Sequence, residues 1–296
     1  MQISKVAMAL LLSRLQVFPA FVNILSGFAL QTNESSTATT GFSSFYGGHS
    51  LETSSMPNHF RFHLHSHLTT NFSLAFETAY VLKYIDLNGR PGTDPWSIRQ
   101  MAIYQNFNIS NTHSDNLLIR SSDQVQKRIS DLVHSKSINT LPTHWTNMHS
   151  VYLGTLNHNW GVYISWIDTL ISQVDFDYFF TKVNGEVPNR LHFEDLQQLN
   201  KGIDVLSQMA QALTLNIEVL TLLSQEAARR ASIEGGTEKG RYEVFQQDTR
   251  TSITEQSFFK RRVGLLQAFA DRRSVQVSYS PVFISIRFLF PSGKMC

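Results

Sequence analysis

Within the stretch HFRFHLHSH, three histidines follow one another at intervals of two residues, at His63, His65 and His67. Residues with this spacing share one face of a β-strand, and neutral imidazoles are good ligands for transition metals. Neighbours on one face of a strand are about 7 Å apart, however, which is too far for two rings to bind one metal unless the strand bends. We therefore expect a solvent-facing or hydrogen-bonded row of histidines, and the metal ligands of the chain stay unassigned.

A second group of histidines, His144, His149 and His158, has spacings of five and nine residues. A metalloprotease helix holds zinc through two histidines four residues apart, so this group predicts core or surface roles. The sequence also has no nucleophile elbow, no Walker A motif, no G-x-G-x-x-G fingerprint and no paired cysteines. We predict that the chain is not an enzyme, and we assign no catalytic and no cofactor-binding residue.

One arginine lies within the stretch DPWSIRQMAIYQNF, which runs from Asp94 to Phe107. The planar guanidinium group of Arg99 can bind an anion, but a half-buried arginine on a strand is more often paired with a nearby carboxylate. Glu77 and Asp86 precede it in the chain and are the candidate partners. We expect a structural ion pair at this position.

The composition is that of a folded protein with a large core. The chain has 296 residues, is 42% apolar, contains 21 Phe and has a net charge of only +2. Its basic groups at 260–262 and 272–273 lack the stripe of cations and stacking aromatics that nucleic-acid binding needs. The single cysteine, Cys296, gives no disulfide framework and no cysteine-based zinc site, and it favours a reducing compartment. We expect no nucleic-acid partner.

The N-terminal segment 6–30 is apolar, but Arg14 and Asn23 interrupt it, and its unbroken apolar run covers only residues 6–12. A membrane-spanning helix needs about 20 predominantly apolar residues. We interpret this segment as two short amphipathic helices that separate near Pro19, rather than as an export signal or a membrane span.

Residues 31–58 are rich in Ser, Thr and Gly, so we expect a variable loop there with an aromatic anchor at Phe42, Phe45 or Tyr46. Alternating residues then predict one strand from Phe60, a second whose alternation runs over 75–82 and a third from Trp96. The stretch NGRPGTDP between the second and third strands has the glycines and prolines of a turn.

A fourth strand is predicted over residues 115–122, followed by a helix over 122–133 with Ser122 as its N-cap. Pro142 suits the first turn of a long helix with a Trp- and Tyr-rich face that extends to Val174, and glycines predict a break near residues 157–161. The order of elements indicates an α+β fold with a sheet between helices.

The most regular pattern of the sequence lies in the C-terminal half. Apolar residues follow alternating steps of three and four across four heptads, at Leu196, Leu199, Ile203, Leu206, Ala210, Leu213, Ile217 and Leu220. This pattern predicts a long helix that contacts a partner helix along its length. A Gly-containing segment, 233–240, interrupts it, and a further helix begins near Tyr242. The two long helices form either an antiparallel hairpin or a continuous stalk.

Several of these segments together resemble the fungal proteins with a CorA-like transporter domain. The resemblance rests on AYVLKYIDLNG, PWSIRQMAIYQNF, NHNWGVYISWID and the long helix LQQLNKGIDVLSQMAQALTLNIEVLTLL, and it covers residues 10–275. It implies a CorA-type helix/sheet/helix cytosolic domain that continues into long coiled helices. It also implies a homopentamer that conducts magnesium or related divalent cations and senses the ion through acidic residues.

The resemblance implies magnesium as a ligand but assigns no ligand residues. Hard cations bind several oxygen atoms. The carboxylates nearest the passage from domain to long helices are Asp168, Asp175, Asp177, Glu194, Asp195, Asp204 and Glu218, and solvated helix faces explain them equally well. A homo-oligomer through the long helices is the partner that the resemblance suggests.

The sequence departs from the CorA pattern at its C-terminal end. It lacks the Gly-Met-Asn motif, and its last apolar run, 282–290, is nine residues long and contains Arg287. We expect an α/β domain over 1–175, a helical stalk over 176–278 and an atypical tail over 279–296 without a membrane span. The chain is then either a truncated, cytoplasmic relative of a membrane transporter that forms no pore itself, or a soluble regulatory or protein-interaction module.

Overall fold

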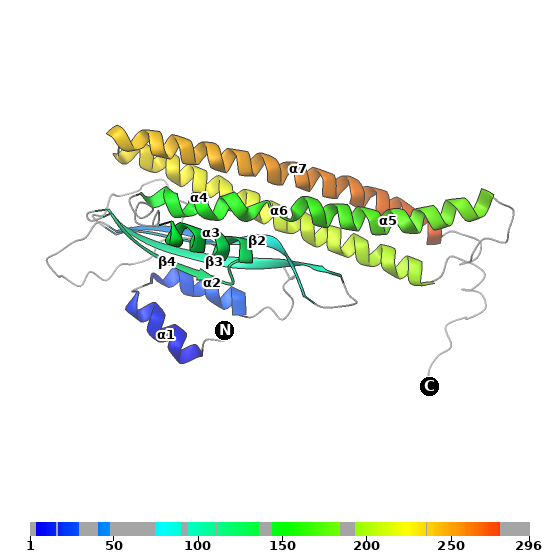
Figure 1. Cartoon of the computed structure of the whole chain (residues 1–296), viewed down its shortest axis with the longest axis horizontal. Coiled ribbons are helices and arrows are strands. Elements are labelled where there is room, and N and C mark those ends of the chain that lie inside the picture. Colours follow the sequence, from blue (N-terminus) through cyan, green and yellow to red (C-terminus); the bar gives the residue numbers. More distant parts are fainter. Residues whose placement is uncertain are drawn as a thin grey trace, which may run out of the picture. The chain divides into compact units, whose positions relative to one another are not determined.

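The computed structural model describes residues 4–15, 17–29, 41–47, 75–89, 94–109, 112–135, 144–183, 193–234 and 236–278. Its elements, shown in Figure 1, are α1 (Lys5–Arg14), α2 (Pro19–Ala29), β1 (Phe42–Gly47), β2 (Ala75–Leu87), β3 (Trp96–Asn108), β4 (His113–Ile119), α3 (Asp123–His134), α4 (Trp145–Leu156), α5 (Trp160–Val183), α6 (Phe193–Glu234), the short 3-10 helix η2 (Gly236–Glu238) and α7 (Lys239–Ser278). The expected strand from Phe60 with His63, His65 and His67, the helix start at Pro142 and the tail 279–296 lie outside the described residues.

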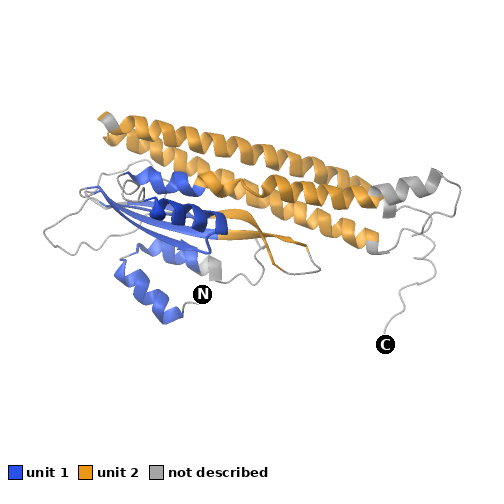
Figure 2. Ribbon diagram, in the orientation of Figure 1, with its two compact units in different colours: residues 1–30, 39–81, 101–152 blue, residues 31–38, 82–100, 153–296 orange. Residues whose placement is uncertain are grey.

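The chain divides into two compact units, which Figure 2 distinguishes by colour. Unit 1 comprises residues 1–30, 39–81 and 101–152, and unit 2 comprises residues 31–38, 82–100 and 153–296. The two longest strands, β2 and β3, contribute residues to both units.

The four strands form one sheet in the order β1-β2-β3-β4. β1 is antiparallel to β2, with Phe42 opposite Tyr80, and β3 is antiparallel to β4, with Ala102 opposite Ile119. Residues 90–93 of the predicted turn lie outside the described structure, but its two ends meet, since the N–H of Asn88 donates to the carbonyl of Pro95 at 2.9 Å. β4 begins at His113, which is earlier than expected. It also ends earlier, at Ile119, because Arg120 has a left-handed φ of 56° that cannot continue a strand.

The expectation that residues 31–58 form only a loop is wrong at β1. The sequence FSSFYG has no strict alternation, and its extended conformation is fixed by pairing with β2, whose first residue, Ala75, follows Gly47 by 28 positions. The expected aromatic anchor is nevertheless confirmed. The ring of Phe42 lies 6.4 Å from that of Tyr80, and the ring of Phe45 lies 6.5 Å from that of Phe18.

Unit 1 has helices on both faces of its part of the sheet. On one face, α2 begins at Pro19 as predicted and buries Phe21 and Ile24 against a patch of Ala79, Val81, Ala102 and Tyr104. On the other face, Trp145 of α4 packs edge-on against Phe76, with the ring centroids 5.2 Å apart. Its indole N–H donates to the hydroxyl of Thr78 at 3.1 Å. None of the α1 residues is fully buried, but Leu12 is partly buried and packs against the same patch as α2.

Unit 2 has a core of helix faces and two strand residues. Its fully packed residues come from β2, β3, α5, α6 and α7, and they include Ile85, Ile98, Trp160, Ile164, Leu206, Leu213 and Val263. The predicted break of the Trp- and Tyr-rich helix is confirmed, since α4 ends at Leu156 and α5 begins at Trp160. The α+β class, with a sheet between helices followed by two long helices, is confirmed as well.

The two long helices form an antiparallel hairpin, so the alternative of a continuous stalk is wrong. Gln267 of α7 donates to Ser207 of α6 at 2.9 Å, and Ser274 donates to Asn200 at 3.2 Å. The heptad pattern of α6 is the contact face, because Leu199, Leu206, Leu213 and Leu220 are buried. Between the helices Gly236 takes a φ of 62°, a conformation that glycine adopts without strain.

Beyond the residues of β2 that pair with β1, the side chain of Asn216 on α6 forms hydrogen bonds with the backbone of β2. The N–H of Val81 donates to Gly41 at 3.1 Å, and two residues further along β2 the N–H of Lys83 donates to the side-chain oxygen of Asn216 at 2.7 Å. The amide nitrogen of Asn216 donates in turn to the carbonyl of Lys83 at 2.8 Å. Asn216 is completely buried, so it satisfies two backbone groups that would otherwise lose their hydrogen bonds.

Candidate functional site

Four of the carboxylates that the sequence singles out have described side chains, and these four do not form one cluster. Asp168 on α5 pairs with Arg262 of α7 at 3.6 Å, while Asp204 and Glu218 are exposed on α6 and Asp195 is half-buried. Asp175, Asp177 and Glu194 lie on described helix backbone, but their side chains lie outside the described structure. Within the described ranges, no group of three or more His, Cys, Asp or Glu side chains is arranged to hold a metal ion.

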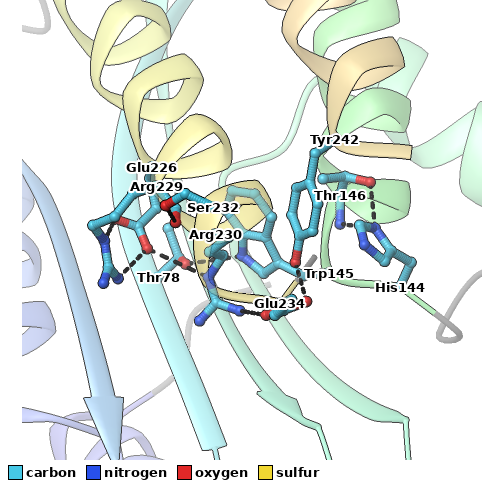
Figure 3. Close-up of polar contacts among 10 residues, drawn as sticks. All are labelled: Thr78, His144, Trp145, Thr146, Glu226, Arg229, Arg230, Ser232, Glu234 and Tyr242. Atoms are coloured by element: carbon cyan, nitrogen blue, oxygen red, sulfur yellow. Dashed lines mark hydrogen bonds and ion pairs between the residues drawn. The ribbon is translucent and has the colours of Figure 1, made fainter. Parts of the chain in front are cut away.

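The predicted structural roles of the helical histidines agree with their contacts. His144 caps the first turn of α4, since its Nδ1 accepts from the hydroxyl of Thr146 at 2.7 Å and from the Thr146 N–H at 3.3 Å (Figure 3). His149 is completely buried, with its Nδ1 at 2.7 Å from the hydroxyl of Tyr80. Burial raises the pKa of Tyr80 well above its usual value, so this hydroxyl stays protonated. His158 is exposed in the turn before α5.

Arg99 forms the structural ion pair that was expected. Its guanidinium lies 3.9 Å from the carboxylate of Asp86 and donates to the carbonyl of Leu87 at 2.7 Å. Glu77 was the wrong alternative, because its carboxylate accepts from the hydroxyl of Tyr104 at 2.7 Å and from the N–H of Phe18 at 3.2 Å. The guanidinium therefore holds the end of β2 against β3 instead of presenting itself to a ligand.

A cluster of ion pairs closes the connected ends of α6 and α7 (Figure 3). The carboxylate of Glu226 accepts from Arg229 at 2.6 Å and from Arg230 at 3.3 Å, and Glu234 accepts from Arg230 at 3.0 Å. Tyr242 of α7 donates to Glu234 at 2.6 Å. Burial lowers the pKa of Arg230, which is 1% exposed, but Tyr242 and the two carboxylates oppose this shift. The two carboxylates of the cluster balance its two guanidinium groups, so we assign the cluster a structural role.

The described residues of unit 2 also form a cavity of about 250 Å³. Its walls come from α5, from α6 and from the end of the β2–β3 turn. The lining residues are Asp94, Trp166, Ile167, Leu170, Ile171, Gln198, Leu199, Lys201, Gly202 and Val205. Most of this lining is apolar, and it includes the carboxylate of Asp94, which is the usual character of a small-molecule site.

Asp94 is oriented by two hydrogen bonds. Its Oδ1 accepts from the N–H of Trp96 at 2.9 Å, and its Oδ2 accepts from the hydroxyl of Tyr163 at 2.9 Å. Burial raises the pKa of Tyr163, and the nearby Asp94 charge adds to this effect, so the hydroxyl remains a donor. Sequence reasoning assigned Asp94 to a turn and missed this role. The available signal was an aspartate two residues before the first strand residue, Trp96.

Comparison with protein families decides what kind of chain carries this cavity. A family model described as CorA-like transporters matches residues 1–176, which is more than half of the chain. The chain belongs to the CorA-like transporter family. By its description, this family is one of transporters and not of enzymes.

Comparisons with individual proteins add less to the CorA-like assignment. No curated protein matches the chain. A solved structure titled "structure of the full-length CmaX protein" aligns with 74% of the chain and 63% of CmaX, at 14% sequence identity and a TM-score of 0.38. This CorA-like chain thus spans less than two thirds of the length of CmaX. Among its described helices, none is both long enough and apolar enough to cross a membrane.

Proposed function

We propose that this CorA-like chain is the cytoplasmic sheet-and-helix part of a divalent-cation transport system, with magnesium as the cation, and that it assembles with copies of itself through its long helices. The observation that carries the proposal is the match of residues 1–176 to the CorA-like transporters. In this proposal residues 1–175 form the α/β domain and residues 176–278 form the stalk through which copies associate.

The exposed face of α7 supports association along the stalk. Ten exposed residues follow alternating steps of three and four without interruption: Val244, Gln247, Thr251, Thr254, Phe258, Arg261, Leu265, Ala268, Arg272 and Val275. Among them, Phe258 is 59% exposed, Leu265 is 68% exposed and Val275 is 55% exposed. Large apolar side chains at heptad spacing on a solvent face suit a further helix from outside the chain.

The carboxylate of Asp204 on α6 lies level with the basic residue Arg272 of α7. The contacts Gln267 to Ser207 and Ser274 to Asn200 fix the register of the hairpin, so Asp204 lies level with the turn that holds Arg272. Both side chains are exposed. In a closed ring, different surfaces of neighbouring copies meet. Such a ring can therefore pair Arg272 of one copy with Asp204 of the next.

Light scattering of the purified chain with and without about millimolar magnesium tests the proposal. We expect an oligomer whose mass changes when magnesium is added, and an Arg272→Glu variant that shifts toward the monomer. A second change, Asp204→Arg in the same chain, should restore assembly because it re-forms the pair with reversed charges. A chain of constant mass, with and without the ion, would favour the alternative of a regulatory or protein-interaction module without transport.

A further inference from the structure

The cavity between α5 and α6 carries an inference that is independent of the proposed transport function. Its volume of about 250 Å³ lies just below the range of roughly 300–1,000 Å³ that is typical of pockets for drug-sized ligands. Much of its lining consists of aliphatic side chains, including Ile167, Ile171, Leu199 and Val205. The space therefore suits a small molecule with an apolar part.

One lining residue of the cavity, Asp94, carries an oriented negative charge. Among the described residues, the two donors to the carboxylate of Asp94 are the N–H of Trp96 and the hydroxyl of Tyr163, and both are neutral. They fix the position of the carboxylate and leave its charge to be balanced by a cation. Lys201 also lines the cavity, but it is exposed and its ammonium lies on a flexible stem that can turn to solvent.

An aromatic row runs beside the same carboxylate. The ring of Trp96 lies 6.3 Å from that of Tyr163, which stacks at 6.0 Å on Trp166, and Trp166 lines the cavity. The face of an indole ring attracts a cation, and it does so more strongly than other aromatic side chains. A carboxylate and an indole in the lining of one mostly apolar cavity are two groups that recognise an organic ammonium ion.

Gly202 keeps the cavity open from the side of α6. A Cβ atom at this position would meet Ile171 only at 3.6 Å and 3.8 Å, which are ordinary contact distances. Helix packing therefore does not require glycine here, although glycine inside a helix costs about 1 kcal/mol relative to alanine. The absence of a side chain enlarges the space beside Ile171.

We propose that this cavity binds a small organic ammonium ion, whose nitrogen contacts Asp94 and Trp166 and whose apolar tail lies between α5 and α6. The ligand class follows from the carboxylate, the indole and the aliphatic lining together.

Titration of the full chain with three probes of equal tail length tests the ligand class. The probes are n-hexylammonium, 1-hexanol and hexanoate, and binding is followed by calorimetry and tryptophan fluorescence. We expect saturable binding of hexylammonium that is about tenfold tighter than that of hexanol, with hexanoate weaker still. Hexanol or hexanoate that binds as tightly as the ammonium would overturn the proposal.

Two variants test the location of the site. Asp94→Asn keeps an oxygen acceptor for Trp96 but removes the charge, so hexylammonium should bind about tenfold more weakly, at the level of hexanol. Gly202→Leu fills the cavity without changing Asp94 and should abolish binding of hexylammonium. Its control is Gly264→Leu on α7, where a Cβ meets nothing within 4 Å and binding should stay unchanged. Wild-type affinity in a folded Gly202→Leu variant would refute the site.

Discussion

Two carboxylate–tyrosine pairs, one in each unit, are built from the same kinds of donor. In unit 1, the carboxylate of Glu77 accepts from the hydroxyl of Tyr104 and from a backbone N–H, that of Phe18. In unit 2, Asp94 accepts from the hydroxyl of Tyr163 and from the N–H of Trp96. In both cases burial raises the pKa of the tyrosine, so each hydroxyl donates at physiological pH.

The two pairs differ in what lies on the free side of the carboxylate. Glu77 lies where Phe18 and Tyr104 pack together, with their rings 6.0 Å apart, and burial raises its pKa in spite of both hydrogen bonds. Asp94 instead lines a cavity. The same two kinds of donor, a tyrosine hydroxyl and a backbone N–H, therefore complete a packed contact in unit 1. In unit 2 they orient a carboxylate that lines a cavity. A hydrogen-bonded carboxylate indicates a site only when its remaining side is open.

The largest difference between the pairs should appear when each carboxylate is removed. Glu77→Ala leaves the hydroxyl of Tyr104 and the N–H of Phe18 without an acceptor in packed surroundings, so we expect the free energy of unfolding to fall by about 2–4 kcal/mol. Asp94→Ala should cost about half as much, because water in the cavity can reach the freed donors. Denaturant unfolding of both variants measures the difference. An equal or larger loss for Asp94→Ala would break the comparison.

Removal of each tyrosine hydroxyl is the next largest test. We expect Tyr104→Phe to lower the free energy of unfolding by about 1–2 kcal/mol, and Tyr163→Phe to lower it by about 0.5–1 kcal/mol. Tyr104→Phe should also raise the pKa of Glu77 further, because the hydrogen bond from Tyr104 lowers that pKa in the wild-type chain. NMR titration of the Glu77 carboxyl group checks this direction, and an unchanged or lower pKa would contradict it.

The raised pKa of Glu77 gives a pH dependence of known sign. Folding favours the protonated form, so this contribution to stability is fully present below the usual pKa of 4.5 and is lost as the pH rises through the higher folded value. Glu77→Gln keeps an acceptor oxygen without the charge. Relative to wild type, the variant should therefore gain stability between about pH 4 and about pH 7, as measured by urea unfolding at both values. A difference that does not vary with pH would contradict this assignment.

The smallest effect should come from Gly202 itself. Gly202→Ala adds a methyl group at ordinary contact distance from Ile171 and removes the conformational cost of glycine, so we expect a gain of up to about 1 kcal/mol. Gly264→Ala on the exposed face of α7 is the matched control and should give a similar gain. A loss of stability in Gly202→Ala alone would show that the position is tightly packed, which would argue against an open cavity.

The sequence predicts the long helices better than it predicts the contacts that define the candidate site. The heptads from Leu196 to Leu220 repeat a local pattern, and the structure buries their face as expected. By contrast, the bond from Tyr163 to Asp94 joins residues 69 positions apart, and it depends on which face of α5 meets the turn. The strand at Phe42 was missed for a related reason, since its conformation depends on a partner strand and not on its own alternation.

The paired hydrogen bonds between Asn216 and Lys83 fix the axial position of α6 against β2. Each residue advances a helix by about 1.5 Å, so a slide of α6 by even one residue would pull both atoms of the amide beyond hydrogen-bonding distance of the strand. Any signal that travels along the hairpin of α6 and α7 must then move the helix and this part of β2 as one body. Within unit 2, mechanical coupling between the hairpin and the end of β2 is built into a single buried amide.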